Sequence, residues 1–270
     1  MRAGVETRTR MLQHLARLGY LSKAVVYAIV GLLAILTAAN RGGRITDTSG
    51  ALRVVLTQPF GRMLLIVLAV GLCGYGVWRL LDAFADPDRD GTSAAGLITR
   101  IGNAVRGLVY GGLAIEAFRL LRGMRGSRGD EAETWTARIL ELPLGPIAVG
   151  IAGAIVTIYG AWELIRSIRG RDDPKVNWSA ISSDVRQAVR SISRFGVGVR
   201  GGLIATLGVF LARAAVTHDP DQAAGTRESL LRLGGLVEGR WFLALIAAGL
   251  LAYAVDQAIH ARFRRIRPVV

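Results

Sequence analysis

Cysteine, histidine and lysine are scarce in this 270-residue chain, which has one cysteine, three histidines, and lysine only at positions 23 and 175. A single cysteine excludes an intramolecular disulfide framework and a cysteine-rich zinc site. The P-loop, HExxH and GxSxG motifs are also missing, so the sequence predicts no enzyme, cofactor or metal site. Acidic residues are also fewer than basic ones: the chain has 20 aspartates and glutamates and 34 lysines and arginines, which gives a formal net charge of +14.

Apolar residues, by contrast, make up 51% of the chain, and the mean hydropathy is +0.39, which together exclude a disordered protein. A helix needs about 20 residues to cross the hydrocarbon core of a bilayer. Apolar runs of about that length occur six times: Leu21–Ala39, Met63–Ala83, Ile101–Leu121, Leu144–Ile165, Phe195–Val216 and Trp241–Ile259. We therefore expect an all-α, six-helix polytopic membrane protein that forms a single membrane domain over residues 1–270.

The six apolar blocks repeat in pairs along the chain. Residues in equivalent places recur at offsets of 83 or 84 and then 94 residues: Gly19, Gly102 and Gly196; Gly61, Gly145 and Gly239; Tyr75, Tyr159 and Tyr253. The pattern predicts three copies of a two-helix hairpin, over residues 12–90, 95–173 and 189–267. Because each copy crosses the membrane twice, all three point the same way, and we expect a pseudo-threefold axis along the membrane normal.

Two motifs accompany these repeats. An Arg-x-Gly-x-x-x-basic sequence opens each pair, and a Gly-Ala-Leu-Arg … Gln-Pro-Phe-Gly-Arg connector spans Gly50–Arg53 and Gln58–Arg62. In this combination the chain resembles the bacterial family called domain of unknown function 1206, over about residues 12–263. The resemblance implies a six-helix bacterial membrane protein and brings no catalytic residues with it.

Basic residues are distributed unequally between the two sides of the expected membrane domain. The side of the N-terminus carries 21 of the 34 lysines and arginines. Since basic loops remain in the cytoplasm, we expect both termini to be cytoplasmic in a bacterial plasma membrane. This sidedness explains the high net charge without a nucleic-acid partner. The first apolar block resembles a signal peptide, but it recurs as the third and fifth blocks, so we expect it to be retained.

Small residues form a stripe on one face of each odd-numbered helix, at spacings of four and then three residues. Such stripes let helix backbones approach closely in a membrane, so we interpret them as packing surfaces; a pore lined by small residues is the alternative. The stripes consist of Ala24, Ala28 and Gly31; Gly107, Gly111 and Ala114; and Gly201, Ala205 and Gly208.

Two rings of basic residues follow from the repeats. The inner ring is Lys23, Arg106 and Arg200, and the outer ring, six residues earlier, is Arg17, Arg100 and Arg194. Long basic side chains near a helix end can snorkel to the headgroups, so anchoring is one interpretation. A converging site for an anionic lipid or solute is the second, and pairing with acidic residues such as Asp82 or Glu163 is the third.

Aromatic side chains recur near the N-terminal-side ends of the even-numbered helices. We interpret Tyr75, Trp78, Tyr159, Trp162 and Tyr253 as a membrane belt, with the tyrosine hydroxyls bonded to backbone carbonyls. Asp256 replaces the third tryptophan, and pairing with an arginine or a functional role are both open. Glu116 is expected to pair with Arg119, with ion coupling as the alternative.

The connecting segments are too short for folded domains. Their alternating sequences predict short surface helices over Leu52–Leu56, Ala137–Leu142 and Ser229–Leu236. Two functions remain. The favoured one is a structural or accessory protein that packs with other membrane proteins or with anionic lipids. The other is a small carrier or channel for an ion or anionic solute.

Overall fold

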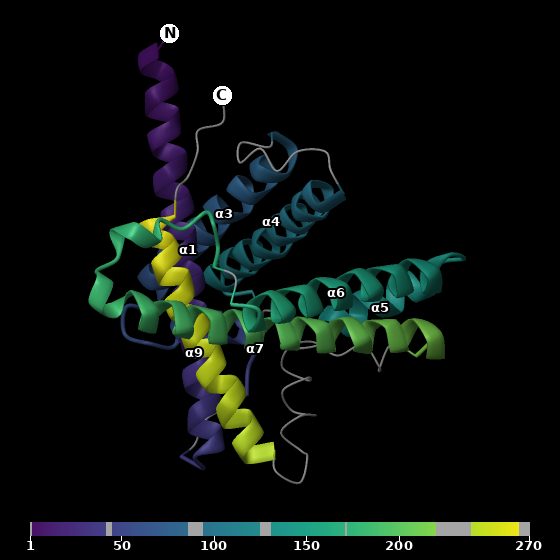
Figure 1. Ribbon diagram of the computed structural model, residues 1–270. Helices are drawn as coiled ribbons and strands as arrows, with labels where there is room; N and C mark the ends of the chain where they lie inside the picture. Colours follow the sequence, from purple (N-terminus) through teal and green to yellow (C-terminus); the bar gives the residue numbers. More distant parts are fainter. Residues whose placement is uncertain are drawn as a thin grey trace.

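The computed structural model describes residues 2–41, 45–85, 94–124, 131–170, 172–219 and 239–264. Regular structure within these ranges is helical, apart from one isolated bridge between Val176 and Arg264. In chain order the helices are α1 (Arg2–Ala38), α2 (Thr48–Leu56), α3 (Gly61–Ala85), α4 (Ala94–Leu121), α5 (Glu131–Leu140), α6 (Gly145–Ile168), η1 (Trp178–Ala180), α7 (Ser183–Thr217) and α9 (Gly239–Phe263). Figure 1 shows their arrangement.

Five helices are long and apolar enough to cross a membrane: α1 from Gln13, α3, α6, α7 and α9 from Arg240. This is the pattern of a multi-pass membrane protein. The remaining expected span, α4, has the necessary length but is not one of these five, and Asn103, Arg106 and Glu116 interrupt its apolar sequence.

Local sequence signals explain where several helices begin and end. Asp47 caps α2, because its Oδ1 accepts the backbone N–H of Gly50 at 2.7 Å. His218 ends α7 in the left-handed region, with φ of 54°. The helices α2 and α5 overlap two of the expected surface helices, whereas Ser229–Leu236 lies outside the described residues.

The long helices pack in three pairs, each joining different repeats. The pairs are α1 with α9, α3 with α4, and α6 with α7. In Figure 1 they radiate from a shared crossing region, and α6 and α7 run side by side away from α1 and α9. Within repeats, α1 packs on α3 and α7 packs on α9, whereas α4 and α6 splay apart.

Each small-residue stripe lies at one of these inter-repeat contacts. A β-carbon placed on Gly160 of α6 would lie 2.6 Å from the carbonyl oxygen of Gly201 in α7. The same construction on Gly31 of α1 meets Ala247 O of α9 at 3.0 Å, and on Gly107 of α4 it meets Gly76 O of α3 at 3.1 Å. These distances require backbone-to-backbone approach, which only small residues permit.

The apolar core is concentrated on one side of the molecule. Its buried residues come mainly from α1, α2, α3, α4 and α9, with Leu203 from α7. In α6 most of the large apolar side chains are exposed. Among the described residues of this helix, Val149 is the large apolar residue that is buried. The pair α6 and α7 is therefore held to the rest mainly through polar contacts and through the crossing with α9.

Candidate functional site

The ammonium group of Lys23 lies in the interior where the helix pairs meet, and 2% of the residue is exposed. Its Nζ donates to the hydroxyl of Tyr75 at 3.1 Å and to that of Tyr253 at 3.3 Å. It also lies 4.5 Å from the ring centre of Tyr75 and 4.7 Å from that of Tyr110. Aromatic faces stabilise a cation removed from water. Lys23 is thus held inside the bundle instead of snorkelling to the headgroups.

The other two residues of the inner ring meet at one carboxylate. Arg200 Nη1 lies 2.7 Å from Glu163 Oε2, and Arg106 Nη2 lies 3.4 Å from Glu163 Oε1. Tyr159 donates to the same Oε1 and accepts from Arg106. The guanidinium of Arg200 also packs 4.9 Å from the ring centre of Tyr253, which connects it to Lys23. The three basic residues are therefore joined through shared tyrosines and Glu163.

Arg79 and Asn103 connect Tyr75 to Arg106, so that the side-chain contacts form a closed path. Arg79 Nε donates to Tyr75 at 2.9 Å, and Arg79 Nη1 donates to Asn103 Oδ1 at 2.9 Å. Arg106 Nη1 reaches the same Oδ1 at 3.0 Å. We call the whole set the core circuit: Lys23, Tyr75, Arg79, Asn103, Arg106, Glu163, Arg200 and Tyr253.

The repeats in the sequence contain a signal for Arg79. At the repeat offsets, Arg79 is equivalent to Glu163 and Gln257, so one position is polar in every copy of an otherwise apolar helix. Its charge differs among the copies: positive, negative and neutral. Asn103 offered a weaker signal, since its equivalents are Tyr20 and Val197.

Basic side chains outnumber the carboxylates that bond to them within the core circuit. Among the described residues, the circuit contains four basic side chains, Lys23 and three arginines, whereas the carboxylates that bond to it are Glu163 and Asp82, which lies 3.1 Å from Arg79. The Nε of Arg200 is buried and has no hydrogen-bond acceptor within the described ranges. A buried cation without a counterion is costly, so this region is suited to an anion.

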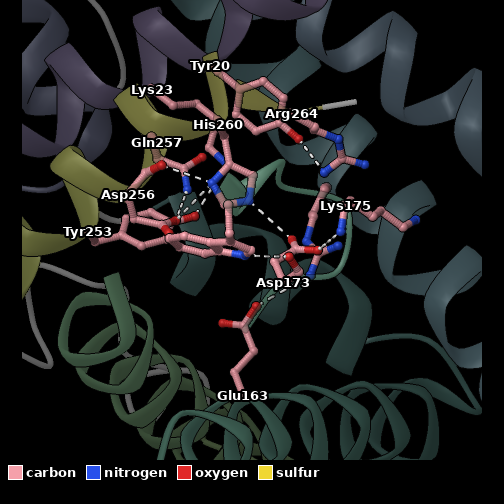
Figure 2. A network of polar contacts seen from close by, with 12 residues as sticks. Tyr20, Lys23, Glu163, Asp173, Lys175, Tyr253, Asp256, Gln257, His260 and Arg264 are labelled. Atoms are coloured by element: carbon pink, nitrogen blue, oxygen red, sulfur yellow. Dashed lines mark hydrogen bonds and ion pairs between the residues drawn. The ribbon is translucent and has the colours of Figure 1, made fainter. Parts of the chain in front are cut away.

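A second polar cluster lies beside the circuit, at the end of α9 (Figure 2). His260 lies between two acidic residues, with Nε2 3.1 Å from Asp173 Oδ2 and Nδ1 2.9 Å from the backbone oxygen of Asp256. Burial disfavours the Asp173 carboxylate, but the hydrogen bond from His260 and nearby positive charge outweigh burial and hold the pKa of Asp173 well below its usual range. Asp173 is therefore ionised at neutral pH.

The segment that carries Asp173 is fastened across the end of α9. The backbone N–H of Asn177 donates to Phe263 O at 2.9 Å, next to the bridge between Val176 and Arg264. Arg264 in turn donates to the Tyr20 hydroxyl at 2.7 Å, and that hydroxyl also accepts from Arg79 at 3.0 Å. Polar contacts thus run from the core circuit to the N-terminal side of the bundle.

The outer basic ring does not converge. Arg17 is exposed, Arg100 donates to the backbone oxygen of Ala83 at 2.8 Å, and Arg194 pairs with Asp172 at 2.9 Å. Each of the latter two arginines has a local acceptor, at the end of α3 or in the segment after α6. A shared ligand site over this ring is therefore not formed.

The aromatic residues differ from the expected belt. Tyr75, Trp78 and Tyr253 are buried, with 0%, 3% and 5% exposed, because they pack around the cations of the interior. Tyr159 is partly buried by its contacts with Arg106 and Glu163, whereas Trp162 is 50% exposed, as a lipid-facing side chain would be. The tyrosine hydroxyls accept hydrogen bonds from basic side chains, and that of Tyr159 also donates to Glu163, where we expected bonds to backbone carbonyls.

The two isolated acidic residues also have other neighbours than expected. Glu116 lies 3.7 Å from Arg53 of α2, so it connects α4 to a surface helix. Asp256 Oδ2 lies 3.4 Å from His260 Nδ1 and accepts a hydrogen bond from Gln257, so within the described residues its neighbours are not the arginine that we expected. Within the described ranges, no cluster of three or more His, Cys, Asp and Glu side chains is placed to hold a metal ion.

Comparisons with known proteins agree with the three repeats. The family model described as Domain of Unknown Function (DUF1206) matches residues 18–86, 101–170 and 195–264. The chain is 32% identical over 244 residues to the "Uncharacterized protein YxxB" of Bacillus subtilis (strain 168), which covers 90% of this chain and 88% of that protein. No solved structure gives a significant match.

Proposed function

Since the chain belongs to the family called Domain of Unknown Function (DUF1206), we propose its function from its interior. It is an accessory membrane protein that binds anionic lipid and packs with other membrane proteins. The single observation that carries this proposal is the excess of positive charge in the core circuit. Phosphate groups of lipids supply the missing negative charge without leaving the membrane.

We also propose that all six long helices cross the membrane, including α4. Its equivalence to α1 and α7 in the repeats supports this, as does its length of 28 residues. The three inter-repeat pairs support an arrangement of the repeats about an axis along the membrane normal, from which the pair α6 and α7 departs. The excess of basic residues on the N-terminal side supports cytoplasmic termini, and the Bacillus relative supports a bacterial plasma membrane.

Lipid analysis of the purified protein tests the binding proposal. We expect the protein in mild detergent to retain phosphatidylglycerol or cardiolipin above their proportion in the source membrane. The variant Arg106→Gln removes one circuit cation and should lower that enrichment, whereas Arg166→Gln, outside the circuit on α6, should not. A wild-type lipid composition equal to the bulk membrane contradicts the proposal.

Folding of the arginine variant is checked separately. Wild-type protein stripped of lipid should gain thermal stability when phosphatidylglycerol is added, because a ligand that binds only the folded state raises its stability. Phosphatidylcholine should produce a smaller increase. This measurement needs no substitution, so a variant that fails to fold leaves it unaffected.

A carrier or channel for an ion or anionic solute is the second candidate. Ionisable residues within membrane helices commonly mark transport paths. The observation in its favour is the chain of contacts from Tyr75 through Arg79 and Tyr20 to Arg264. Anion or proton flux into liposomes that contain the protein, abolished by Arg79→Gln, would favour this candidate over the accessory role.

A further inference from the structure

We infer that the anionic lipid binds in the seam between α4 and α6, with its phosphate at Arg106 and its acyl chains along α6. This assignment rests on the proposed lipid binding and gives it a place. The two helices of the first repeat pack against each other, and so do those of the third repeat. The two helices of the second repeat, α4 and α6, do not, and the seam is the open interface between them.

Glycines close the equivalent interfaces in the other two repeats. A β-carbon on Gly19 of α1 would lie 2.9 Å from the backbone oxygen of Gly71 in α3 and would overlap Tyr75. One on Gly196 of α7 would lie 2.5 Å from the backbone carbon of Ala252 in α9. At Gly102 of α4, the corresponding construction finds its nearest neighbour, a ring carbon of Tyr159, at 3.9 Å.

The sequence of α6 explains why this interface is open. Where α3 has Gly71 and Gly74, and α9 has Gly249 and Ala252, α6 has isoleucine at both equivalent positions. These side chains, Ile155 and Ile158, are 49% and 68% exposed. Two branched side chains keep the backbones of α4 and α6 apart, because close helix approach needs small residues.

The facing side of α4 is equally uncovered. Val105 is 46% exposed, whereas its equivalent in the first repeat, Ser22, is 2% exposed beneath α3. An open groove of about 550 Å³ continues from Ile158 between α6 and α7, with Ala154, Val209 and Ala212 among its lining residues. The seam and this groove together offer apolar surface of the kind that acyl chains cover.

Charge at the seam selects an anionic lipid over other occupants. The side chain of Arg106 is 21% exposed, more than those of Glu163 and Arg200 behind it, at 10% and 11%. A phosphate at Arg106 would meet the charge excess of the core circuit, and charge-assisted bonds from guanidinium to phosphate are strong. A neutral partner helix or a second copy would leave that excess uncompensated.

Photo-crosslinking tests the location of the lipid. A benzoylphenylalanine replaces Ile155, and in a matched control it replaces Leu245 of α9, which is 51% exposed. The proteins are placed in nanodiscs of phosphatidylglycerol and phosphatidylethanolamine, and the adducts are identified by mass spectrometry. We expect phosphatidylglycerol to be enriched at position 155 over position 245, and the enrichment to disappear with Arg106→Gln.

Two outcomes overturn the assignment. Adducts of equal composition at both positions mean that ordinary bilayer lipid covers the seam, and adducts to a polypeptide mean that another helix or copy occupies it. If purified protein retains anionic lipid while position 155 shows no enrichment, the seam is wrong and the proposed lipid binding stands. If neither is observed, both fail.

A second variant closes the seam. Ile155→Gly with Ile158→Ala reproduces the α9 sequence at Gly249 and Ala252, so α6 should pack on α4. We expect a folded protein whose phosphatidylglycerol affinity falls about tenfold, equivalent to about 1.4 kcal/mol. The control pair Leu64→Gly with Val67→Ala has the same spacing on exposed positions of α3 and should keep wild-type affinity. Equal affinity in both double variants contradicts the seam.

Discussion

Single residues in the interior are stabilised by sharing a small number of oxygen atoms. Tyr75 accepts from both Lys23 and Arg79, and Asn103 Oδ1 accepts from both Arg79 and Arg106. Glu163 has a further role, because it places negative charge between two guanidinium groups. Where water is excluded, such shared acceptors replace the hydration that each cation has lost.

Glu163→Gln is the sharpest test at this scale. The amide keeps the shape of the side chain but leaves Arg106 and Arg200 without their carboxylate, and removal of one member of a buried ion pair costs about 3–5 kcal/mol. We expect a marked fall in the thermal unfolding midpoint in detergent. Glu141→Gln, at an exposed position before α6, should leave the midpoint unchanged. Equal midpoints in the two variants would show that Glu163 does not hold the circuit together.

Helices in this protein associate through backbone proximity. The contact between α6 and α7 combines Gly153 and Gly160 with Gly201 and Gly208, and a β-carbon on Gly208 would lie 2.7 Å from Gly153 O. In a bilayer, lipid tails are as apolar as leucine, so burial of apolar surface does not by itself hold two helices together. Close packing of these glycines accounts for the closeness of the pair despite the exposure of its other side chains.

Gly160→Ala tests this contact with a single methyl group. Its β-carbon would lie 2.6 Å from Gly201 O and overlap Ala205, both at backbone atoms that cannot move away cheaply. We expect a loss of about 1–3 kcal/mol, typical of overpacking, measured by thermal or chemical unfolding.

Gly112→Ala is the matched control on α4. Its β-carbon would have no neighbour within 4 Å among the described residues, and alanine favours a helix by about 1 kcal/mol over glycine. We therefore expect unchanged or raised stability. If Gly160→Ala behaves like Gly112→Ala, the glycine contact does not stabilise the α6 and α7 pair.

On the scale of the whole molecule, the first and last long helices close the arrangement. The helix α1 packs along α9, and Arg240 Nε donates to Ala38 O at 2.8 Å across more than two hundred residues of chain. The contact between Arg264 and Tyr20 joins the C-terminal end of α9 to the middle of α1. The beginning of α1 and the end of α9 therefore lie on one side of the bundle.

Labelling of single cysteines tests this sidedness. In a Cys73→Ser background, cysteine replaces the exposed residues His14 and Arg262 on the N-terminal side, or Thr57 and Leu142 on the opposite side. A membrane-impermeant maleimide added to intact cells should label positions 57 and 142, and positions 14 and 262 only after permeabilisation. The reverse pattern contradicts cytoplasmic termini. If intact cells label only one of positions 14 and 262, the chain crosses the membrane an odd number of times between them, which contradicts the six proposed crossings.

Several features of the fold could be predicted because they depend on local composition. Apolar length marks long helices, and repeated glycines mark the hairpins, whose number agrees with the family match. The stripes at Gly31, Gly107 and Gly201 were identifiable because helical periodicity places their members on one face. Trp78 shows the limit, since tryptophan near a helix end is typical both of a lipid belt and of a buried cation contact.

The sequence by itself determined that this chain is helical, membrane-like and threefold repeated, because periodicity and hydropathy act through neighbouring residues. Tertiary structure decided which residues meet, such as Glu163 with two arginines and Arg79 with Asn103. It also decided which helices of different repeats pack together: α1 with α9, α4 with α3, and α7 with α6. It also decided that the second repeat stays open. Equivalent positions in a repeat carry the same local signals, but small differences such as Ile155 for glycine act only when two helices approach each other.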